Sequence, residues 1–153
     1  MNKDKVKVKV TNLTKKFGDL LVLDDISFEV MEGEFLCIVG PTGCGKTTFL
    51  NSLTKLYDIT AGEILVNGEP VDLKKHNIAY IFQEYSTFPW LKVEENIKYG
   101  LKLKKLPEHV IQERADAVIR MVGLEEFRNY YPDQLSASML QREVIARAFA
   151  VQP

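Results

Sequence analysis

The sequence predicts an α/β protein with a strand-rich first half and a helical second half. One observation is the order of patterns near residue 40. The apolar run Phe35–Val39 leads into the glycine-rich segment Gly40–Thr48, after which apolar residues recur at helical spacing. The other observation is the second half of the chain, where Pro107 and Gly123 mark the start and the stop of a helical pattern.

Short alternating or apolar runs predict the strands of the first half. Residues 5–11 and Ile26–Met31 alternate between apolar and polar side chains, and Phe35–Val39 is apolar throughout, as a buried strand should be. Glu63–Val66 is followed by Asn-Gly, a strong hairpin signal. Ile78–Phe82 is a further short apolar run, which predicts another strand.

Helical spacing predicts four helices. The first follows the glycine-rich segment and runs to about Lys55, and the second covers Val93–Leu103. The third starts at Pro107, and its expected apolar face consists of Ile111, Ala115, Val118, Ile119 and Val122. The last covers Ser138–Ala150, and its expected apolar face consists of Leu140, Val144, Ile145, Ala148 and Phe149.

Composition narrows the class of protein. The chain has 153 residues, which suits one domain or a fragment of a larger one, and at 46% hydrophobic residues it can build a core. A formal net charge of −1 gives no electrostatic case for nucleic acid as a partner. The local basic run Lys3, Lys5, Lys7 and Lys9 alternates with valines, which favours a strand with one solvated face whose lysines discourage edge pairing.

Cysteine usage and hydropathy indicate a cytosolic setting. Cys37 and Cys44 are the only cysteines, and a disulfide between them would distort the glycine-rich loop. The N-terminus has no secretory signal, and no apolar run is long enough to cross a bilayer. If the protein acts at a membrane, we expect it to dock on a partner.

The segment Gly40–Thr48 fits Gly-x-x-x-x-Gly-Lys-Thr, the phosphate loop of nucleotide-binding proteins. Gly40, Gly43 and Gly45 can adopt a positive φ, and they leave no Cβ between the backbone and a ligand. Backbone N–H groups then form a cradle for anions, and the following helix offers its positive N-terminal end to the same phosphates. The alternative is a glycine-rich turn without a ligand.

Side chains of the loop add specific contacts. Lys46 supplies a mobile charge for the β- and γ-phosphates, the Thr47 hydroxyl is placed to ligate Mg²⁺, and Thr48 can donate on the α-phosphate side. ATP and Mg²⁺ are therefore the expected ligands. The candidate nucleotide-binding residues of the loop are Gly40, Pro41, Thr42, Gly43, Cys44, Gly45, Lys46, Thr47 and Thr48.

Several markers fall in one order along the chain: Phe17-Gly18, the loop, Gln83 in Tyr80–Glu84, Leu135–Arg142 at the start of a helix, and Ile145–Pro153. In this order they resemble the nucleotide-binding subunit of ATP-binding cassette (ABC) transporters, with Gly40–Thr48 as the Walker A motif. The segment Phe88–Ile97 looks most like the importers for nitrate, sulfonate and taurine. A P-loop kinase or GTPase would explain neither Gln83 nor Leu135–Arg142, and no Asn-Lys-x-Asp motif is present.

The resemblance implies a P-loop NTPase (RecA-like) core with an N-terminal antiparallel β part and a helical subdomain. Residues 1–83 would form the β-subdomain and the phosphate-loop part of the core, and residues 84–153 the helical subdomain with the signature helix. The implied function is ATP binding and hydrolysis coupled to solute import, at the inner face of the cell membrane. The implied partners are a transmembrane permease, a second nucleotide-binding subunit and, indirectly, a solute-binding protein.

The resemblance also assigns roles outside the loop. Phe17 would stack on adenine, where the family usually has Tyr, although an ordinary core Phe is the alternative. Gln83 would contact Mg²⁺ and the attacking water, which would make it catalytic together with Lys46; a polar residue at a strand end is the alternative. Ser136 would reach the γ-phosphate on the partner subunit. Glu84–Leu91 and the helices after it would form the surface that receives a permease helix. Pro89-Trp90-Leu91 would be its exposed apolar contact, with a plain core Trp as the alternative.

Two departures from the family limit the implied function. The signature usually reads Leu-Ser-Gly-Gly, and here Ala137 and Ser138 replace both glycines, so we expect a weakened site for the partner's nucleotide. The sequence also stops at Pro153, before the Asp-Glu strand and the His of the family. These departures predict an incomplete core sheet with a sticky apolar edge. They also leave open whether this chain hydrolyses ATP, and the alternative to the transport function is a truncated or degenerate cassette that binds nucleotide without turnover.

Overall fold

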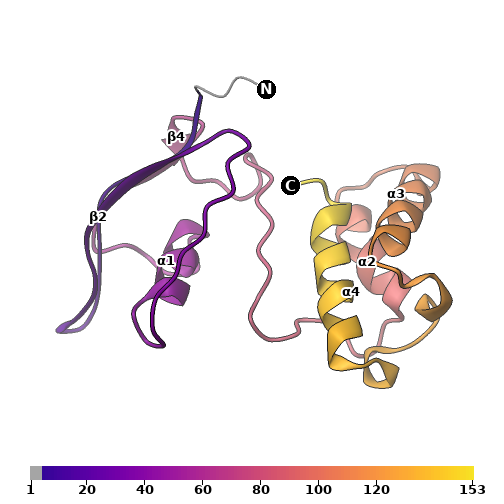
Figure 1. The fold of residues 1–153 in the computed structure, drawn as a ribbon. Helices are drawn as coiled ribbons and strands as arrows, with labels where there is room; N and C mark the ends of the chain where they lie inside the picture. The colour runs from indigo at the N-terminus through magenta and orange to yellow at the C-terminus, as the bar shows by residue number, and fades with distance from the viewer. Residues whose placement is uncertain (1–4) are drawn as a thin grey trace. The chain divides into compact units, whose positions relative to one another are not determined.

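The computed structural model describes residues 5–153, which form two compact units, the first ending at His76 and the second beginning at Asn77 (Figure 1). The boundary predicted after residue 83 separates the nucleotide-binding part from the helical subdomain, and it stays a prediction. The first unit is a four-stranded antiparallel sheet, in the order β2-β1-β3-β4, with one helix. Its elements are β1 (Val6–Phe17), β2 (Leu20–Met31), α1 (Lys46–Leu53), β3 (Ala61–Val66) and β4 (Glu69–Pro70).

Both hairpins of the sheet have left-handed turn residues. Asn67 (φ 54°) and Gly68 (φ 79°) connect β3 to β4, which confirms the hairpin predicted there. Gly18 (φ 57°) lies in the turn between β1 and β2, so Phe17 pairs with Leu20. The pairing of β1 with β2 and β3 also shows that the edge assignment of its lysines was wrong, since β1 is paired on both sides.

Apolar side chains of the sheet and α1 make the core of the first unit. Helix α1 packs against β2 through Phe49, whose ring centroid lies 5.5 Å from that of Phe28. The basic run contributes a surface contact, because Lys9 pairs with Glu29 of β2 at 2.8 Å, while Lys3 lies outside the described residues. The buried apolar residues of this unit are Val10, Leu13, Leu23, Phe49, Ile64, Val66 and Val71.

An irregular stretch of β1 brings two backbones unusually close. The register of β1 shifts between Thr11 and Thr14, and Asn12 adopts a φ of 49°. The Asn12 amide group donates to Asp25 Oδ1 at 2.6 Å, and its backbone N–H donates to Ser27 Oγ at 2.8 Å. Gly62 of β3 faces this bulge so closely that an added methyl group would lie 2.3 Å from the Asn12 carbonyl oxygen. Only glycine fits at this point of the sheet.

The strands predicted at Phe35–Val39 and Ile78–Phe82 are wrong for this structure, which has no regular secondary structure in either segment. A strand is stabilised by hydrogen bonds to a neighbour, and no described strand pairs with these segments. Phe35 is 92% exposed and Val39 84% exposed, so Cys37 is also not buried as expected. A largely apolar cavity of about 490 Å³ lies between this segment, β2 and the start of α1. The predicted stickiness of this apolar segment stays a prediction.

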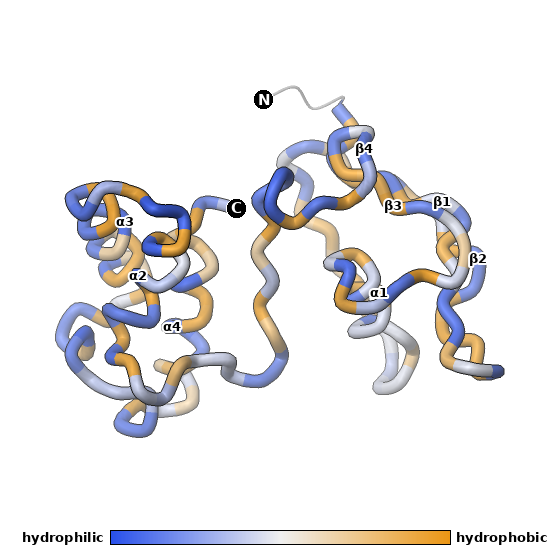
Figure 2. Tube along the Cα trace, turned by 180° about the vertical axis from the view of Figure 1, so that it is seen from behind, coloured by the Kyte–Doolittle hydropathy of each residue, from blue (hydrophilic) through white to orange (hydrophobic). Residues whose placement is uncertain are grey.

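The second unit is a helical bundle, and its helices confirm the predicted ones to within two residues at each end. Along each helix hydrophobic and hydrophilic residues alternate around the axis (Figure 2). The stop at Gly123 is also confirmed, since this residue has a φ of 65° just after α3. The elements are α2 (Val93–Leu103), α3 (Glu108–Met121), the 3-10 turns η1 (Glu125–Phe127) and η2 (Pro132–Gln134), and α4 (Ala137–Ala150).

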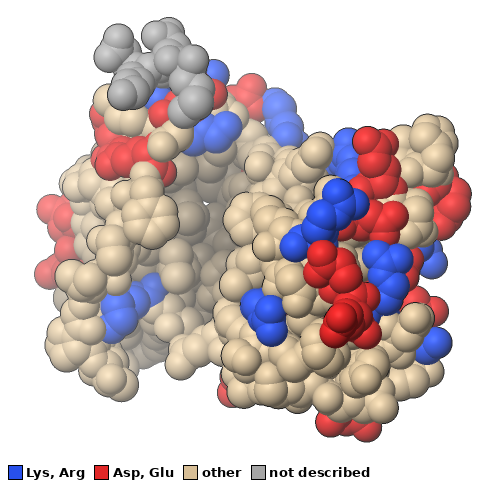
Figure 3. All heavy atoms as spheres, turned by 45° about the vertical axis from the view of Figure 1, so that its right-hand side comes forward, with Lys and Arg blue, Asp and Glu red and all other residues tan. Residues whose placement is uncertain are grey.

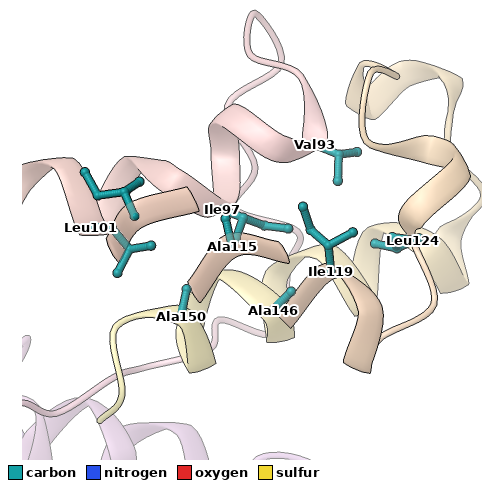
Figure 4. Close-up of a cluster of buried hydrophobic side chains, with 9 residues drawn as sticks. Val93, Ile97, Leu101, Ala115, Ile119, Leu124, Ala146 and Ala150 are labelled. Carbon is teal, nitrogen blue, oxygen red and sulfur yellow. The ribbon is translucent and has the colours of Figure 1, made fainter. Parts of the chain in front are cut away.

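The three helices enclose one hydrophobic core. Figure 4 shows its side chains pointing toward one another from α2, α3 and α4. The buried residues are Val93, Ile97, Leu101, Ile111, Ala115, Ile119, Leu124, Ala146 and Ala150. The predicted face of α3 is confirmed by Ile111, Ala115 and Ile119, with Val118 and Val122 partly buried against them.

The apolar face predicted for α4 is wrong in part. Val144 is buried as expected, but Phe149 is 52% exposed. The buried face instead carries Ala146 and Ala150, whose small side chains let α4 approach α2 and α3 closely (Figure 4). It also carries Glu143, which is 0% exposed, a residue that no apolar pattern could select.

Charged side chains of both signs are interleaved on one face of the second unit (Figure 3). Arg128 donates to Asp116 Oδ1 at 2.6 Å, and this hydrogen bond lowers the pKa of the Asp116 carboxyl. On α2, Lys98 pairs with Glu94 at 2.7 Å. These contacts tie α3 to the turn after it and add to α2 a pair at the favourable i, i+4 spacing.

Candidate functional site

The glycine-rich loop has the backbone geometry predicted for two of its three glycines. Gly43 has a φ of 83°, and Gly45, at the N-cap position of α1, has a φ of 98°. Gly40 can adopt a positive φ, but it is not in the left-handed region in this structure. Gly40 is needed for space instead, because an added methyl group there would lie 2.7 Å from Cys44 Sγ.

The side chain of Lys46 is folded back across the loop. Its ammonium Nζ donates to the carbonyl oxygens of Gly40 and Pro41, each at 2.7 Å, and lies 3.5 Å from Cys44 Sγ. The loop therefore curls around a positive charge. A phosphate oxygen that enters the loop can replace these carbonyls as the acceptor of the same N–H groups.

The start of α1 adds a second electropositive feature to the loop. Helix α1 begins at Lys46, and its first turn contains no acidic residue. The N–H groups of a first helical turn have no acceptor within the helix, so they are available to an anion. Thr47 is exposed and Thr48 half-buried in this turn. The residues present thus fit a polyphosphate with a bound cation.

The sheet register places Phe17 at the distance of a nucleotide base from the loop. Gly45 backs onto β2, since an added methyl group there would lie 3.0 Å from Leu23 Cδ2. Leu23 pairs with Lys15 of β1, and Phe17 pairs with Leu20, three residues farther along β2. At a strand rise of about 3.3 Å per residue, Phe17 lies roughly 10 Å along the sheet from the loop.

The ring of Phe17 is accessible and flanked by two residues that sequence reasoning missed. Phe17 is 44% exposed, which argues against the alternative of an ordinary core Phe. Tyr57 meets it edge-on with ring centroids 5.4 Å apart, and Lys15 Nζ lies 4.6 Å from its centroid. The i, i+2 spacing of Lys15 and Phe17 on one strand was a signal in the sequence, whereas Tyr57 follows α1 and had none.

The remaining candidates, Gln83 and Ser136, belong to the second unit, and both are exposed. No strand forms before Gln83, so its alternative as a polar residue at a strand end is wrong. Ser136 is the N-cap of α4 and accepts from the Met139 N–H at 3.4 Å. Ala137 and Ser138 occupy the first turn of α4, and neither has a positive φ, so their side chains cause no backbone strain.

The loop contains left-handed glycines, holds a lysine ammonium and leads into a helix N-terminus. An accessible aromatic ring lies farther along the same sheet. Together these features define the class of phosphate-loop nucleotide-binding proteins. The family model described as "ABC transporter" matches residues 23–153. The chain belongs to the ABC transporter family. The predicted family and the predicted fold class, an α/β P-loop NTPase cassette, are therefore confirmed.

Individual relatives agree with this assignment. The sulfate/thiosulfate import ATP-binding protein CysA of Synechocystis is 40% identical over 147 residues, which cover 94% of this chain and 41% of that protein. The structure of cbiO1 from Clostridium perfringens, part of the ABC transporter complex cbiONQ, has a TM-score of 0.87 at 26% identity, covering 98% of this chain and 63% of that chain. The ATP-binding cassette MJ0796, a dimer bound to ADP and Pi, has a TM-score of 0.83 at 33% identity, covering 95% and 70%.

The matched proteins are longer than this chain, which spans between 34% and 57% of the lengths of the curated relatives compared. None of the helices in the described part of the chain combines the length and hydropathy that a bilayer crossing needs. The relatives named as import proteins do not single out the nitrate, sulfonate and taurine type, and this finer assignment stays a prediction.

Proposed function

We propose that this chain binds ATP with Mg²⁺ as the nucleotide-binding part of an ABC importer that couples ATP hydrolysis to solute import. The observation that carries the proposal is the loop closed around the Lys46 ammonium at the N-terminus of α1. The import role rests on relatives named as import ATP-binding proteins for sulfate, spermidine and Fe³⁺. Binding without turnover is the alternative, and phosphate release by the purified chain distinguishes the two.

Each candidate residue has a role in this proposal. Lys46 would bind the β- and γ-phosphates, and the hydroxyl of Thr47 would ligate Mg²⁺. Phe17 binds the base through the accessible face of its ring. Gln83 would contact Mg²⁺ and orient the attacking water, and Ser136 would reach the nucleotide of the partner subunit. ATP supplies the phosphoryl group that is transferred to water.

The proposed partners follow from the same family. A transmembrane permease would dock on the second unit, where Trp90 is 71% exposed beside Phe88. A second nucleotide-binding subunit is supported by the dimeric structure of MJ0796, and a solute-binding protein would act through the permease. The proposed location is the cytoplasmic face of the cell membrane. Nucleic acid is not among the proposed partners, because the net charge is −1.

The loop is tested by replacing Lys46 with alanine. Losing a charge-assisted hydrogen bond costs about 1.5–3 kcal/mol, so the affinity for ATP should fall roughly 10- to 150-fold, as measured by calorimetry. Lys74→Ala, an exposed lysine of the same unit, is the control and should bind as the native chain does. ATP should also slow alkylation of Cys44. Unchanged affinity in Lys46→Ala would place the nucleotide elsewhere.

The altered signature is tested by restoring glycine at Ala137 and Ser138 together. Removing two Cβ atoms lets the backbone come closer to the partner's γ-phosphate, so ATP should promote association more strongly in the double variant than in the native chain. Analytical ultracentrifugation with and without ATP measures this association. Equal association of the two chains would show that these side chains do not weaken the site.

A further inference from the structure

A carboxyl group lies inside the helical unit without a hydrogen-bond partner. Glu143 of α4 is 0% exposed, and neither Oε1 nor Oε2 accepts a hydrogen bond from the described residues. Burying a polar group in this way is costly, so such a residue calls for an explanation other than packing. The function proposed above makes no use of it.

Arg147, one helical turn after Glu143, connects α4 to the segment that contains Gln83. Its Nη2 donates to Ser86 Oγ at 2.8 Å, and its guanidinium carbon lies 5.3 Å from the ring centroid of Phe88. Its Nη1 is buried and has no hydrogen-bond partner among the described residues. Of the two terminal nitrogens of the guanidinium, Nη2 thus donates to the segment, and Nη1 remains available to another acceptor.

The segment from Gln83 to Phe88 is attached to the helices at two points. At Phe88 the buried side chain of Asn96 accepts from the backbone N–H at 2.8 Å and donates to the carbonyl oxygen at 3.1 Å. This contact fixes the end of the segment to α2. The Arg147 contact at Ser86 lies nearer to Gln83, three residues away, and is therefore the one that restrains Gln83.

The charge of Glu143 is sensitive to pH near neutrality. Burial raises the pKa of the Glu143 carboxyl to about 7, against the opposing pull of the Arg147 charge. Among the described residues Arg147 is the charged group that acts on it. On the helices packed against α4, Glu94 pairs with Lys98 within α2, and Asp116 of α3 pairs with Arg128.

We propose that Glu143 is a positioning residue that controls, through Arg147, how firmly the segment carrying Gln83 is held against α4. Residues at i and i+4 lie on one face of a helix, so an ionised Glu143 can draw the spare donor of Arg147 toward itself. The guanidinium then withdraws from Ser86 and Phe88, and the segment is released. When Glu143 is neutral, Arg147 stays on Ser86. The consequence for Gln83 rests on the proposed function; the movement itself does not.

The only tryptophan of the chain reports on this movement. Trp90 lies 5.6 Å from Phe88, ring centroid to ring centroid, and Phe88 is the ring under Arg147. Trp90 fluorescence of the full chain without nucleotide, followed from about pH 5 to about pH 9, should change with a midpoint near 7. Glu143→Gln, which keeps the shape and removes the charge, should abolish this transition. Ser86→Ala should reduce its amplitude.

Histidine titration is the alternative source of such a transition, and His76 and His109 are the only histidines. The double variant His76→Gln, His109→Gln should keep the transition. Its loss in this variant would overturn the proposal, as would an unchanged transition in a folded Glu143→Gln chain. The histidine variant gives an answer even if Glu143→Gln fails to fold. Because the fluorescence experiment contains no nucleotide, a failure of this proposal is distinguishable from a failure of the proposed function, which would appear as unchanged ATP affinity in Lys46→Ala.

Discussion

Gly62→Ala should destabilise the first unit by about 3 kcal/mol or more. Two costs combine, because a left-handed residue with a side chain costs about 1–2 kcal/mol and forcing extra volume into a packed site costs about 1–3 kcal/mol. The second cost falls at its upper end, since the added methyl group would meet the backbone of Asn12 at 2.3 Å and the Thr11 carbonyl oxygen at 2.6 Å. Backbone atoms cannot turn aside as a flexible side chain does, so the pairing of β1 with β3 must open.

A matched control lies in the same hairpin. Gly68 also has a left-handed φ, 79°, but an added methyl group there would meet no atom within 4 Å. Gly68→Ala should therefore cost only the conformational term of about 1–2 kcal/mol. Hydrogen exchange of the β1 and β3 amides measures both variants, with the amides of α2–α4 as an internal reference. Equal loss of protection in the two variants would refute the close approach at the Asn12 bulge.

Glu143→Gln should remove a pH-dependent loss of stability worth about 3 kcal/mol. Burial raises the pKa of Glu143 from 4.5 to about 7, so the folded chain favours the neutral carboxyl. Each pKa unit corresponds to about 1.4 kcal/mol. The stabilisation of the folded chain by the neutral Glu143 carboxyl is fully present below pH 4.5 and is lost as the pH rises to about 7. Above that pH the free energy of unfolding no longer changes through this group.

Urea unfolding of the second unit, followed by Trp90 fluorescence across this pH range, measures the difference. The stability of Glu143→Gln relative to the native chain should rise by about 3 kcal/mol from acidic to neutral pH. Glu113→Gln, on the exposed side of α3, is the control and should follow the native profile. Parallel profiles for Glu143→Gln and the native chain would show that the Glu143 carboxyl carries no such penalty.

Local sequence patterns predicted the helices of the second unit and the β3–β4 hairpin. Val93–Leu103 was predicted with the observed bounds, because its apolar spacing and its flanking residues are local signals. The turn at Asn67 and Gly68 needs a positive φ at both residues, and this requirement is also local. The apolar run Phe35–Val39 signals a preference for burial, but a strand also needs a neighbour, which a local pattern does not show.

The candidate site was also predictable only where its residues are consecutive in the sequence. The loop from Gly40 to Thr48 could be recognised because its chemistry is contained in consecutive residues. The contact of Phe17 with Tyr57 could not be recognised, because Tyr57 reaches Phe17 only through folding of the sheet and α1. Glu143 could not be predicted either, because glutamates are almost never fully buried and no local pattern marks this one as an exception.

The hydrogen bonds that Lys46 makes within its own loop affect the thermodynamics of ligand entry. A lysine free in solvent would lose side-chain rotamer freedom on binding phosphate, at a cost of up to about 2 kcal/mol. Here the ammonium is already held by the carbonyl oxygens of Gly40 and Pro41. Phosphate binding thus exchanges one set of hydrogen-bond acceptors for another at a pre-organised cation. Most of the entropy cost of ordering the Lys46 side chain arises on folding, so it does not oppose ligand binding.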